Sequence, residues 1–408
     1  MNAPQKNIVF DARWMTPVPS GISVYSLELL RRMPSLAPGW RWHVIFRDEA
    51  QRDSVMEACA FPQSLKVTAA VFPHGPLSPR SQLSLPRLLR SIRCDLFHSP
   101  NYMVPFRAFG SPAAMLGLAP ASRKGCGVCV TTIHDAIPLI LKDYAPRSAT
   151  SRMLWLYRDS MRFAVRCSAR TITGSEASRR DIAAALRLSE KEAASFRTIY
   201  DGVADRFSPA PEGAAAHVAA PSHGGQPARI VLYVGRLDPY KNVPMLVDAF
   251  AMIRRETDKP IHLLIVGPED PRYPEARLHA QYRGISENVS FIHGASDAEL
   301  LAAYRSATVL VNPSRYEGFG LPMVEAMKCG IPVICTDGGS QPEIAGGAAE
   351  IVPAGDEAAL AGAIKRVLED DSLRKDLSAK GLERAKRFSW DATAAETLAL
   401  YKEVLGGQ

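Results

Sequence analysis

The sequence contains no run that is long and apolar enough to span a membrane. No stretch approaches the ~18 consecutive uncharged apolar residues that a spanning helix needs, and the least charged one, Ala108–Ser122, is interrupted by glycine and proline. The opening residues, MNAPQKNIVF, include no apolar core of a secretion signal. We therefore expect a cytoplasmic protein without a membrane-spanning segment.

Cysteine is scarce: the chain has 7 in 408 residues, and they are scattered. An odd, dispersed set indicates reduced thiols rather than a disulfide framework. Cys126 and Cys129 form a single CxxC pair, but a structural zinc ion needs four ligands and no second pair exists. We interpret the pair as two small residues that lead into a strand, and we expect no metal site.

Several phosphate-binding signatures are also missing. The chain has no Walker sequence, no GxGxxG string and no strong DxD cluster that would hold Mg²⁺. Its composition, with 47% hydrophobic and 22% charged residues, is that of a globular protein and excludes a disordered chain, a coiled coil and a collagen-like fibre. At ~100–200 residues per domain, the length predicts two domains.

Charge is divided unevenly along the chain. Residues 1–210 hold 28 Lys and Arg against 16 Asp and Glu, whereas residues 211–408 hold 21 against 26, although the net charge of the whole chain is only +7. A basic half joined to an acidic half suggests that one half meets an anionic partner. Nucleic acid, a membrane surface and a phosphorylated substrate are the candidates at this point.

Short apolar runs alternate with amphipathic ones in both halves, which predicts an α/β protein with parallel sheets covered by helices on both faces. Ser296 and Glu299 form a capping box ahead of an apolar periodic run. Pro244 suits the first turn of a helix, and Gly330 suits the left-handed residue that follows one. The predicted strands are Asn7–Asp11, Trp42–Phe46, Lys66–Val71, Leu96–Ser99, Cys129–His134, Arg170–Gly174, Ile230–Gly235, His262–Gly267, Val289–His293, Val309–Asn312 and Pro332–Thr336. The predicted helices are Ser23–Met33, Leu83–Ile92, Ser151–Cys167, Ser178–Leu188, Val243–Arg254, Pro274–Tyr282, Asp297–Ser306, Pro322–Cys329 and two or three more between Glu357 and Leu405.

The stretch Ser208–Gln226 is rich in Ala, Pro and Gly and has no apolar period, which predicts an exposed linker. We therefore expect a Rossmann-like domain at 1–207, a linker at 208–228, a second Rossmann-like domain at 229–385 and a terminal helix at 386–408. Ligands of doubly wound folds bind at the carboxyl ends of the strands, so residues that directly follow predicted strands are the candidates for chemistry.

The loop Gly235–Asn242 follows the opening strand of the second half. Gly235 at the strand end allows a ligand to approach the backbone, and Arg236 and Lys241 offer two cations to an anion. A helix begins near Asn242, and its N-terminus also favours negative charge. The loop is suited to a diphosphate bound without a metal; the alternative is a surface loop with two solvated cations.

The segment Glu317–Glu325 lies between another predicted strand and helix. Glu325 is expected in the first turn of the helix that Pro322 opens, where a carboxylate is favourable and can accept hydrogen bonds from two vicinal hydroxyls. Phe319–Leu321 bring backbone N–H groups to the helix entrance, where an anion or a hydroxyl can dock. Two glutamates at this spacing also occur by chance, so the Gly-Phe-Gly-Leu-Pro string between them carries most of the signal.

Two residues of the first half have weaker signals. His134, at a strand end, is suited to hydrogen bonding or acid/base chemistry, and alternatively to capping a loop together with Asp135. Gly21 lies between the first strand and the first helix. It would let a ligand phosphate approach the helix start, or it would simply form a turn.

Arginines recur every four residues along the predicted helix Ser151–Cys167 and its flank, and we expect them to share one face. They are Arg158, Arg162, Arg166 and Arg170. A second basic group consists of Arg80, Arg87, Arg90 and Arg93. Basic amphipathic segments can lie on anionic membranes, although a solvated face over an ordinary core is the simpler alternative.

Taken together, these strings resemble the retaining glycosyltransferases of family 4, which have the GT-B architecture of two doubly wound Rossmann-like domains facing across a cleft. The resemblance covers nearly the whole chain, and mannosyl-type transferases of bacterial surface-polysaccharide assembly, such as lipopolysaccharide O-antigen, fit the pattern best. The second-half strings that match are GRLDPYKN (Gly235–Asn242), IHLLIVGPEDPRY (Ile261–Tyr273), EGFGLPMVE (Glu317–Glu325), DGGSQPE (Asp337–Glu343) and FSWDATAAETLALYKEVL (Phe388–Leu405). The less specific first-half strings are SGISVYSLELL (Ser20–Leu30), IHD (Ile133–Asp135) and TGSEASRRDI (Thr173–Ile182).

The resemblance implies a donor-binding role for the second half. Arg236 and Lys241 would hold the donor diphosphate and stabilise it as it leaves, with backbone access at Gly235. Glu325 would bind the ribose hydroxyls. Glu317 would hold the donor sugar together with the backbone of the segment that follows it, which is Gly318, Phe319, Gly320 and Leu321.

The resemblance also implies an acceptor-binding role for the first half. His134 would contact the donor sugar near the reacting carbon, and Gly21 would give the backbone access to the donor phosphate and the acceptor. The catalytic set would then be His134, Glu317, Arg236 and Lys241. The terminal helix would cross back onto the first domain.

The implied reaction moves a hexose, expected to be mannose from GDP-mannose, to a glycan or a polyprenyl-diphosphate-linked glycan. Preorganised cations and helix dipoles would stabilise the leaving diphosphate, so neither a metal nor another cofactor is expected. No carboxylate is evident as a nucleophile, so same-face attack with the leaving phosphate as base is the preferred route to retention. The basic half would then face an anionic membrane, as a peripheral contact on its inner face, and nucleic acid is no longer expected.

Two other functions stay open. A nucleotide-sugar 2-epimerase uses two similar domains but needs no acceptor, and it would need additional acid/base groups in the cleft. A non-catalytic, membrane-associated scaffold would keep the fold without turnover, although the intact basic and acidic residues of the two second-half loops argue against it.

The chain departs from the family pattern at one loop. Family members often have Asn-Gly-Val-Asp after the first domain, whereas this chain has Asp201-Gly-Val-Ala204. The contacts of that loop are therefore expected to differ.

Overall fold

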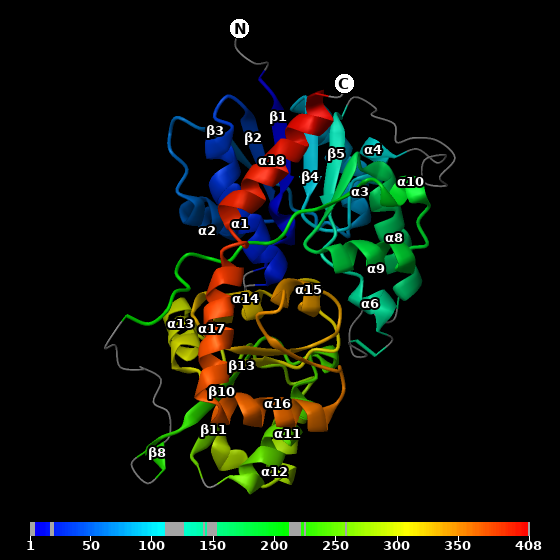
Figure 1. Ribbon diagram of the computed structural model, residues 1–408. Coiled ribbons are helices and arrows are strands. Elements are labelled where there is room, and N and C mark those ends of the chain that lie inside the picture. The colour runs from blue at the N-terminus through cyan, green and yellow to red at the C-terminus, as the bar shows by residue number, and fades with distance from the viewer. Residues whose placement is uncertain are drawn as a thin grey trace. The chain divides into compact units, whose positions relative to one another are not determined.

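The chain folds into two compact units, each built on its own parallel sheet (Figure 1). The computed structural model describes residues 5–16, 20–110, 126–141, 143–144, 153–211, 222–223, 226–257 and 259–406. The first unit consists of residues 1–136, 153–202 and 390–408, and the second of residues 137–152 and 203–389. The terminal segment therefore belongs to the same unit as the start of the chain.

The first unit contains a seven-stranded parallel sheet in the order β3-β2-β1-β4-β5-β6-β7. The order of strands along the chain reverses between β1 and β4, which makes this point the topological switch where doubly wound sheets bind ligands. The strands are β1 (Asn7–Asp11), β2 (Arg41–Phe46), β3 (Lys66–Val71), β4 (Leu96–Ser99), β5 (Val128–Thr132), β6 (Arg170–Thr173) and β7 (Phe196–Thr198).

Helices cover both faces of this sheet. Because neighbouring residues of a strand point to opposite faces, Val9 and Phe97 pack with α3, α4 and α8. Phe10 and His98 lie on the other face, where His98 meets Tyr401 of α18. The helices are η1 (Ala12–Trp14), α1 (Gly21–Leu36), α2 (Glu49–Cys59), α3 (Pro79–Ser91), α4 (Phe106–Phe109), α8 (Leu154–Cys167), α9 (Glu176–Ala185), α10 (Glu190–Ala193) and α18 (Trp390–Gly406).

The second unit contains a six-stranded parallel sheet in the order β12-β11-β10-β13-β14-β15, with its switch point between β10 and β13. Its core lies between the sheet and α11, α12 and α16, where Val231 and Leu263 are fully buried. The strands are β10 (Arg229–Val234), β11 (Ile261–Val266), β12 (Val289–Ile292), β13 (Val309–Asn312), β14 (Val333–Thr336) and β15 (Glu350–Val352). The helices are α6 (Ile137–Ile140), η2 (Pro239–Lys241), α11 (Val243–Glu256), α12 (Glu275–Tyr282), η3 (Ser286–Asn288), α13 (Asp297–Ser306), α14 (Leu321–Lys328), α15 (Gln341–Ala345), α16 (Glu357–Glu369) and α17 (Asp371–Ala385).

Two doubly wound parallel sheets confirm the predicted α/β fold class, and the local helix signals are confirmed as well. Ser296 and Glu299 form the capping box of α13, and Pro244 lies in the first turn of α11. Gly330 has a φ of 76°, the left-handed conformation that glycine adopts most easily.

Several elements carried no readable signal in the sequence. The strands β7 and β15 are each three residues long and bury only one residue, so they show no alternation. The helix α2 was also missed, because Val55 is its only buried residue and it presents no apolar stripe.

The predicted linker at 208–228 contains two very short strands. β8 (Ser222–His223) and β9 (Gln226–Pro227) pair antiparallel. Residues 212–221 and 224–225 of this stretch lie outside the described residues.

The prediction of four arginines on one helix face is wrong. Arg170 lies in β6, beyond the end of α8. Arg162 donates to the carbonyl of Leu186, and Arg166 pairs with Glu192 at 2.7 Å, so these two guanidinium groups are already engaged. The arginines of the second basic group, by contrast, are all exposed on or directly after α3; they are Arg80, Arg87, Arg90 and Arg93.

The Cys126–Cys129 pair is buried at the entrance to β5, as predicted for residues that lead into a strand. Within the described ranges, no three His, Cys, Asp or Glu side chains are arranged to hold a metal ion. The described helices also include none with the length and apolarity that crossing a membrane requires.

Candidate active site

Two charged residues from distant parts of the sequence meet at the switch point of the second sheet. Lys241 ends the turn η2 after β10, and Glu317 lies in the loop after β13, the strand that neighbours β10. Their side chains form an ion pair in which Lys241 Nζ lies 2.7 Å from Glu317 Oε1 and 2.9 Å from Oε2. The two loops that were predicted separately therefore form one site.

Backbone contacts hold these two loops together. The N–H of Arg315 donates to the carbonyl of Tyr240 at 2.8 Å, directly beside the ion pair. The Ser314 hydroxyl donates to Glu317 Oε1 at 2.6 Å, which orients the carboxylate from below. The position of Glu317 is thus set by both loops, and only 7% of it is exposed.

The ion pair controls the charge of Lys241. Burial by itself would lower the pKa of this ammonium group, but the neighbouring carboxylate of Glu317 outweighs burial, and the pKa is raised. Lys241 is therefore charged at neutral pH. A half-buried, charged ammonium group just after a strand is suited to holding an anionic ligand group.

Arg236, the second predicted cation, lies on the same loop but is not part of this pair. Its guanidinium is exposed and folds back onto Asp238, with Nε 2.7 Å from Oδ2. Gly235, directly before it, has a φ of 150°, and a Cβ there would lie only 2.8 Å from the Tyr233 hydroxyl, so a side chain does not fit. The absence of a side chain at Gly235 thus leaves the loop backbone accessible to a ligand, next to the cations of Arg236 and Lys241.

The N-terminus of α14 points its backbone donors into the same loop region. Gly320 is the N-cap residue with a left-handed φ of 93°, and no side chain caps the helix. The segment before the helix is buried: Gly318 and Phe319 are enclosed, and Phe319 packs edge-on against Phe388. Leu321 begins the helix, so its backbone N–H group is one of those left without an intrahelical partner.

Glu325 does not lie in the first turn of its helix, contrary to the prediction. Because α14 begins at Leu321, Glu325 is its fifth residue and belongs to the second turn. It accepts a hydrogen bond from the Tyr304 hydroxyl at 2.6 Å through Oε2. Burial raises the pKa of this carboxyl, and the hydrogen bond from Tyr304 opposes that effect.

Two side chains to which the sequence assigned no role, Ser340 and Gln341, hydrogen-bond to the backbone of the Glu317 loop. Ser340 donates to the carbonyls of Glu317 and Phe319, at 3.0 and 3.2 Å. Gln341 donates to the carbonyl of Ser314 at 3.0 Å and to the Thr336 hydroxyl at 2.7 Å. The only available signal was the DGGSQPE string, whose serine and glutamine had been given no role.

His134 lies in the first unit, two residues after β5. Its Nε2 lies 3.0 Å from the carbonyl of Pro100, which can only accept, so Nε2 carries the proton. Burial lowers the pKa of His134 to about 4. The side chain is therefore neutral at pH 7, and Nδ1 can only accept a hydrogen bond; the histidine is not suited to act as a charged acid.

Gly21 is the first residue of α1 and is exposed, and nothing lies within 4 Å of a Cβ built there. The fold itself therefore does not require glycine at this position. Gly21 and His134 belong to the first unit, whereas the other predicted site residues belong to the second.

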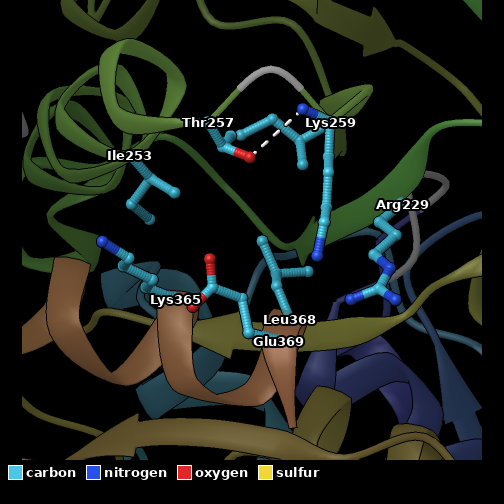
Figure 2. A pocket seen from close by; sticks show the side chains of 8 residues that line it. Arg229, Ile253, Thr257, Lys259, Lys365, Leu368 and Glu369 are labelled. Atoms are coloured by element: carbon cyan, nitrogen blue, oxygen red, sulfur yellow. Dashed lines mark hydrogen bonds between the residues drawn. The ribbon is translucent and has the colours of Figure 1, made fainter. Parts of the chain in front are cut away.

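A pocket elsewhere on the second unit is not part of this site. Figure 2 shows that it is lined by side chains such as Arg229, Lys259 and Glu369. Arg229 is the first residue of β10, so the pocket lies at the amino edge of the sheet, opposite to the Lys241–Glu317 pair. Lys365, also in the lining, is paired with Glu256 at 2.7 Å.

Two family models match the chain, one for each part. The model "Glycosyltransferase Family 4" matches residues 19–206, and the model "Glycosyl transferases group 1" matches residues 222–384. The second match contains Lys241, Glu317 and Glu325.

Curated relatives are about one third identical to this chain over the residues that align. The O-antigen chain mannosyltransferase B of Escherichia coli is 36% identical over 175 residues, which is 42% of this chain and 45% of the relative. The MMP alpha-(1->4)-mannosyltransferase of Mycolicibacterium hassiacum is 33% identical over 55% of each chain. The chain thus aligns with about half the length of the curated relatives it matches.

Solved structures match over nearly the whole chain. A sucrose-phosphate synthase from Thermosynechococcus elongatus superposes with a TM-score of 0.72 at 22% identity, covering 99% of this chain and 100% of the other. The Anabaena protein HepE, solved in complex with UDP, superposes with a TM-score of 0.68 at 19% identity, covering 97% and 100%. At these identities the likeness establishes the fold, and the fold is GT-B. On this fold the two family matches follow each other along the chain, so the chain contains a glycosyltransferase family 4 domain at residues 19–206 followed by a glycosyl transferases group 1 domain at residues 222–384.

Proposed function

We propose that the protein is a retaining hexosyltransferase that moves mannose from GDP-mannose to a glycan or a polyprenyl-diphosphate-linked glycan in surface-polysaccharide assembly. The observation that carries the proposal is the Lys241–Glu317 ion pair at the switch point of the second sheet. It combines a charged group for a phosphate with a carboxylate for sugar hydroxyls. The mannosyltransferase names of relatives about 35% identical support the choice of sugar.

The second unit would bind the donor. Lys241 and Arg236 would hold the diphosphate beside the uncapped N-terminus of α14, where the backbone of Gly318–Leu321 adds hydrogen-bond donors. Glu317 would accept hydrogen bonds from the sugar, and Glu325 from the ribose hydroxyls. Donor binding would require Arg236 to turn from Asp238 toward the phosphate, and its exposure permits this movement.

The transfer step would need no metal and no protein nucleophile. The acceptor hydroxyl oxygen would attack the anomeric carbon on the face from which the diphosphate leaves. The carbon–oxygen bond to the diphosphate would break, and the hydroxyl proton would pass to a leaving phosphate oxygen. Lys241 would stabilise the negative charge that develops there. His134, neutral and with its proton on Nε2, would accept a hydrogen bond from a sugar hydroxyl through Nδ1.

The first unit would bind the acceptor and rest on an anionic membrane. The surface that supports this part of the proposal is the exposed face of α3, where Arg87 and Arg90 accompany exposed Leu83. Leu83 is 55% exposed and Leu77, just before the helix, is 59% exposed. Apolar side chains beside exposed arginines suit the boundary of an anionic bilayer.

A donor panel tests the proposal directly. Thermal unfolding is measured with GDP-, UDP-, ADP- and dTDP-sugars, since a bound donor raises the midpoint in proportion to the logarithm of its concentration over its Kd. GDP-mannose is expected to give the largest shift, and labelled mannose is expected to appear on a lipid-linked acceptor. Epimerised sugar in the absence of any acceptor would instead favour an epimerase and overturn the proposal.

A further inference from the structure

Four polar side chains of the first unit form one buried network of hydrogen bonds that ends beside His134. The Tyr401 hydroxyl of α18 lies 2.5 Å from Nδ1 of His98, which belongs to β4. Nε2 of His98 lies 2.8 Å from Oγ1 of Thr132, the last residue of β5. The same oxygen lies 2.9 Å from the hydroxyl of Tyr25 in α1. None of the four residues is more than 1% exposed.

The titratable members of this network are neutral at pH 7. Burial lowers the pKa of His98 to about 3. Burial also raises the pKa of Tyr25, and the carboxyl of Asp201, a buried residue that follows β7, adds to this effect. A neutral imidazole donates through one nitrogen and accepts through the other, and His98 has a partner at each, Tyr401 and Thr132. A buried network connected in this way restricts the motion of its members.

The Tyr25 end of the network packs against the imidazole of His134. The two rings stand nearly perpendicular, with centroids 5.0 Å apart and an angle of 87° between their planes. Nε2 of His134 lies 3.0 Å from the carbonyl of Pro100. A hydrogen bond at one atom still permits the imidazole to tilt, whereas a ring packed at a right angle to it restricts its plane. Tyr25 therefore supplies the second constraint on His134.

The plane of this imidazole matters because it directs Nδ1. With the proton on Nε2, Nδ1 is the nitrogen that would accept a hydrogen bond from a sugar hydroxyl. A tilt of the ring moves Nδ1 and its lone pair away from that hydroxyl, and a misplacement of about 1 Å can lower a rate about 10²-fold. Loss of the constraint at Tyr25 would thus act on transfer through His134.

We propose that Tyr25 is a positioning residue for His134: its ring sets the plane of the imidazole, and the network through Thr132 and His98 to Tyr401 holds Tyr25 in place. This role rests on the proposed function, which assigns the sugar contact to His134. It also gives the terminal helix a part in the site. Tyr401 lies 303 positions after His98, and the network is complete only because α18 returns to the first unit.

Two substitutions of Tyr25 separate its ring from its hydroxyl. Tyr25→Leu removes the ring, whereas Tyr25→Phe keeps it and removes only the hydrogen bond to Thr132. At saturating donor and acceptor, kcat per folded molecule is expected to fall about 100-fold in Tyr25→Leu and about fivefold in Tyr25→Phe. The Kd for GDP is expected to stay unchanged in both variants, because GDP carries no sugar. A purely structural role would lower the yield of folded protein but not kcat per folded molecule.

Nitrogen-15 spectra of the histidine-labelled full chain at pH 7 test the positioning itself. The ring nitrogens of His134, assigned by comparison with His134→Gln, are expected to show the separate shifts of one neutral tautomer in the wild type. In Tyr25→Leu they are expected to move toward the average of two tautomers, because a tilting ring no longer holds Nε2 at the Pro100 carbonyl. The spectra involve no transfer, so they decide the positioning role even if the wild type transfers no mannose.

Thr397→Val is the matched control. It removes a buried hydroxyl from the same helix as Tyr401, but that hydroxyl donates to the Thr393 carbonyl of its own helix at 2.7 Å. The variant is expected to keep the wild-type kcat and His134 shifts. The proposal is overturned if the His134 shifts of Tyr25→Leu equal those of the wild type, or if its kcat equals that of Thr397→Val.

A variant at the far end of the network covers the case in which Tyr25→Leu does not fold. Tyr401→Phe keeps its ring but removes the hydrogen bond to His98, and kcat is expected to fall about threefold. Unchanged His134 shifts and unchanged kcat in both Tyr25→Phe and Tyr401→Phe would then overturn the proposal.

Discussion

The two units place different chemistry at the same edge of similar sheets. At the carboxyl edge of the second sheet the side chains are charged and paired, as in Lys241–Glu317 and Arg236–Asp238. At the carboxyl edge of the first sheet, a buried ion pair between Asp11 and Arg13 lies at the end of β1, but the groups after β5 are neutral: His134 is uncharged at pH 7, and Tyr25 shares a hydrogen bond of 2.9 Å with Thr132. A charged edge suits a diphosphate, whereas a neutral, hydrogen-bonding edge suits hydroxyl groups.

Burial explains the difference. The second edge uses ion pairs, which keep buried groups charged because each partner compensates for the water that the other has lost. The first edge has no such pairs around His134 and Asp201 in its described part, so burial drives both groups to their neutral forms. Buried groups thus stay charged where a partner of opposite charge lies beside them, and they become neutral where none does.

The largest effect is expected from removing the cation of the charged edge. Lys241→Ala should lower kcat for transfer by about 10²–10³, because a preorganised charge on the leaving group is lost. Steady-state kinetics with a lipid-linked acceptor measures this. Lys259→Ala, at the opposite edge of the same sheet, is the matched control and should leave kcat unchanged. Equal rates for wild type and Lys241→Ala would contradict the site.

The neutral edge is expected to respond to pH instead. Because the pKa of Asp201 is raised to about 7, its contribution to stability is complete below about pH 4 and is lost as the pH approaches 7. The free energy of unfolding of the first unit should fall by about 2 kcal/mol between pH 5 and pH 7 through this group. Urea unfolding at both pH values measures it, and the difference between wild type and Asp201→Asn isolates it. A difference that does not change with pH would be inconsistent with a titrating Asp201.

A smaller effect is expected at the nucleoside end of the charged edge. Glu325→Gln should raise the donor KM by about tenfold, since hydrogen bonds to a charged carboxylate become hydrogen bonds to a neutral amide. Tyr304→Phe, which removes the hydroxyl that orients Glu325, should raise it by less. Donor titrations at saturating acceptor separate KM from kcat. A fall in kcat alone would place Glu325 outside the donor-binding role.

The smallest effect is expected on the surface of the first unit. Arg87→Ala should weaken binding to anionic vesicles about fivefold, because one basic side chain near such a surface contributes about 1 kcal/mol. Arg166→Ala is the control, since Arg166 is paired with Glu192. Co-sedimentation with and without anionic lipid measures both variants. If binding to vesicles does not depend on the anionic lipid, the proposed contact with an anionic membrane is wrong.

Much of the fold could be predicted because its elements carry local signals. Long buried strands such as Ile261–Val266 are largely continuous apolar runs. The start of α13 could be predicted because the sequence contains its capping box. The loops of the site were found for the same reason, since each directly follows such a strand. Short or exposed elements such as α2 and β7 were not predicted, because each buries a single residue and its sequence therefore shows no repeating pattern of apolar residues.

The sequence by itself determined the alternation of strands and helices, the two loops of the second unit and the types of residue that they present. Only the tertiary structure decided which of those residues meet. Lys241 and Glu317 are 76 positions apart, and they pair because the crossover order of the sheet makes β10 and β13 neighbours. It also decided the charge of His134 and Asp201, because a pKa depends on burial and on partners, and a linear sequence records neither.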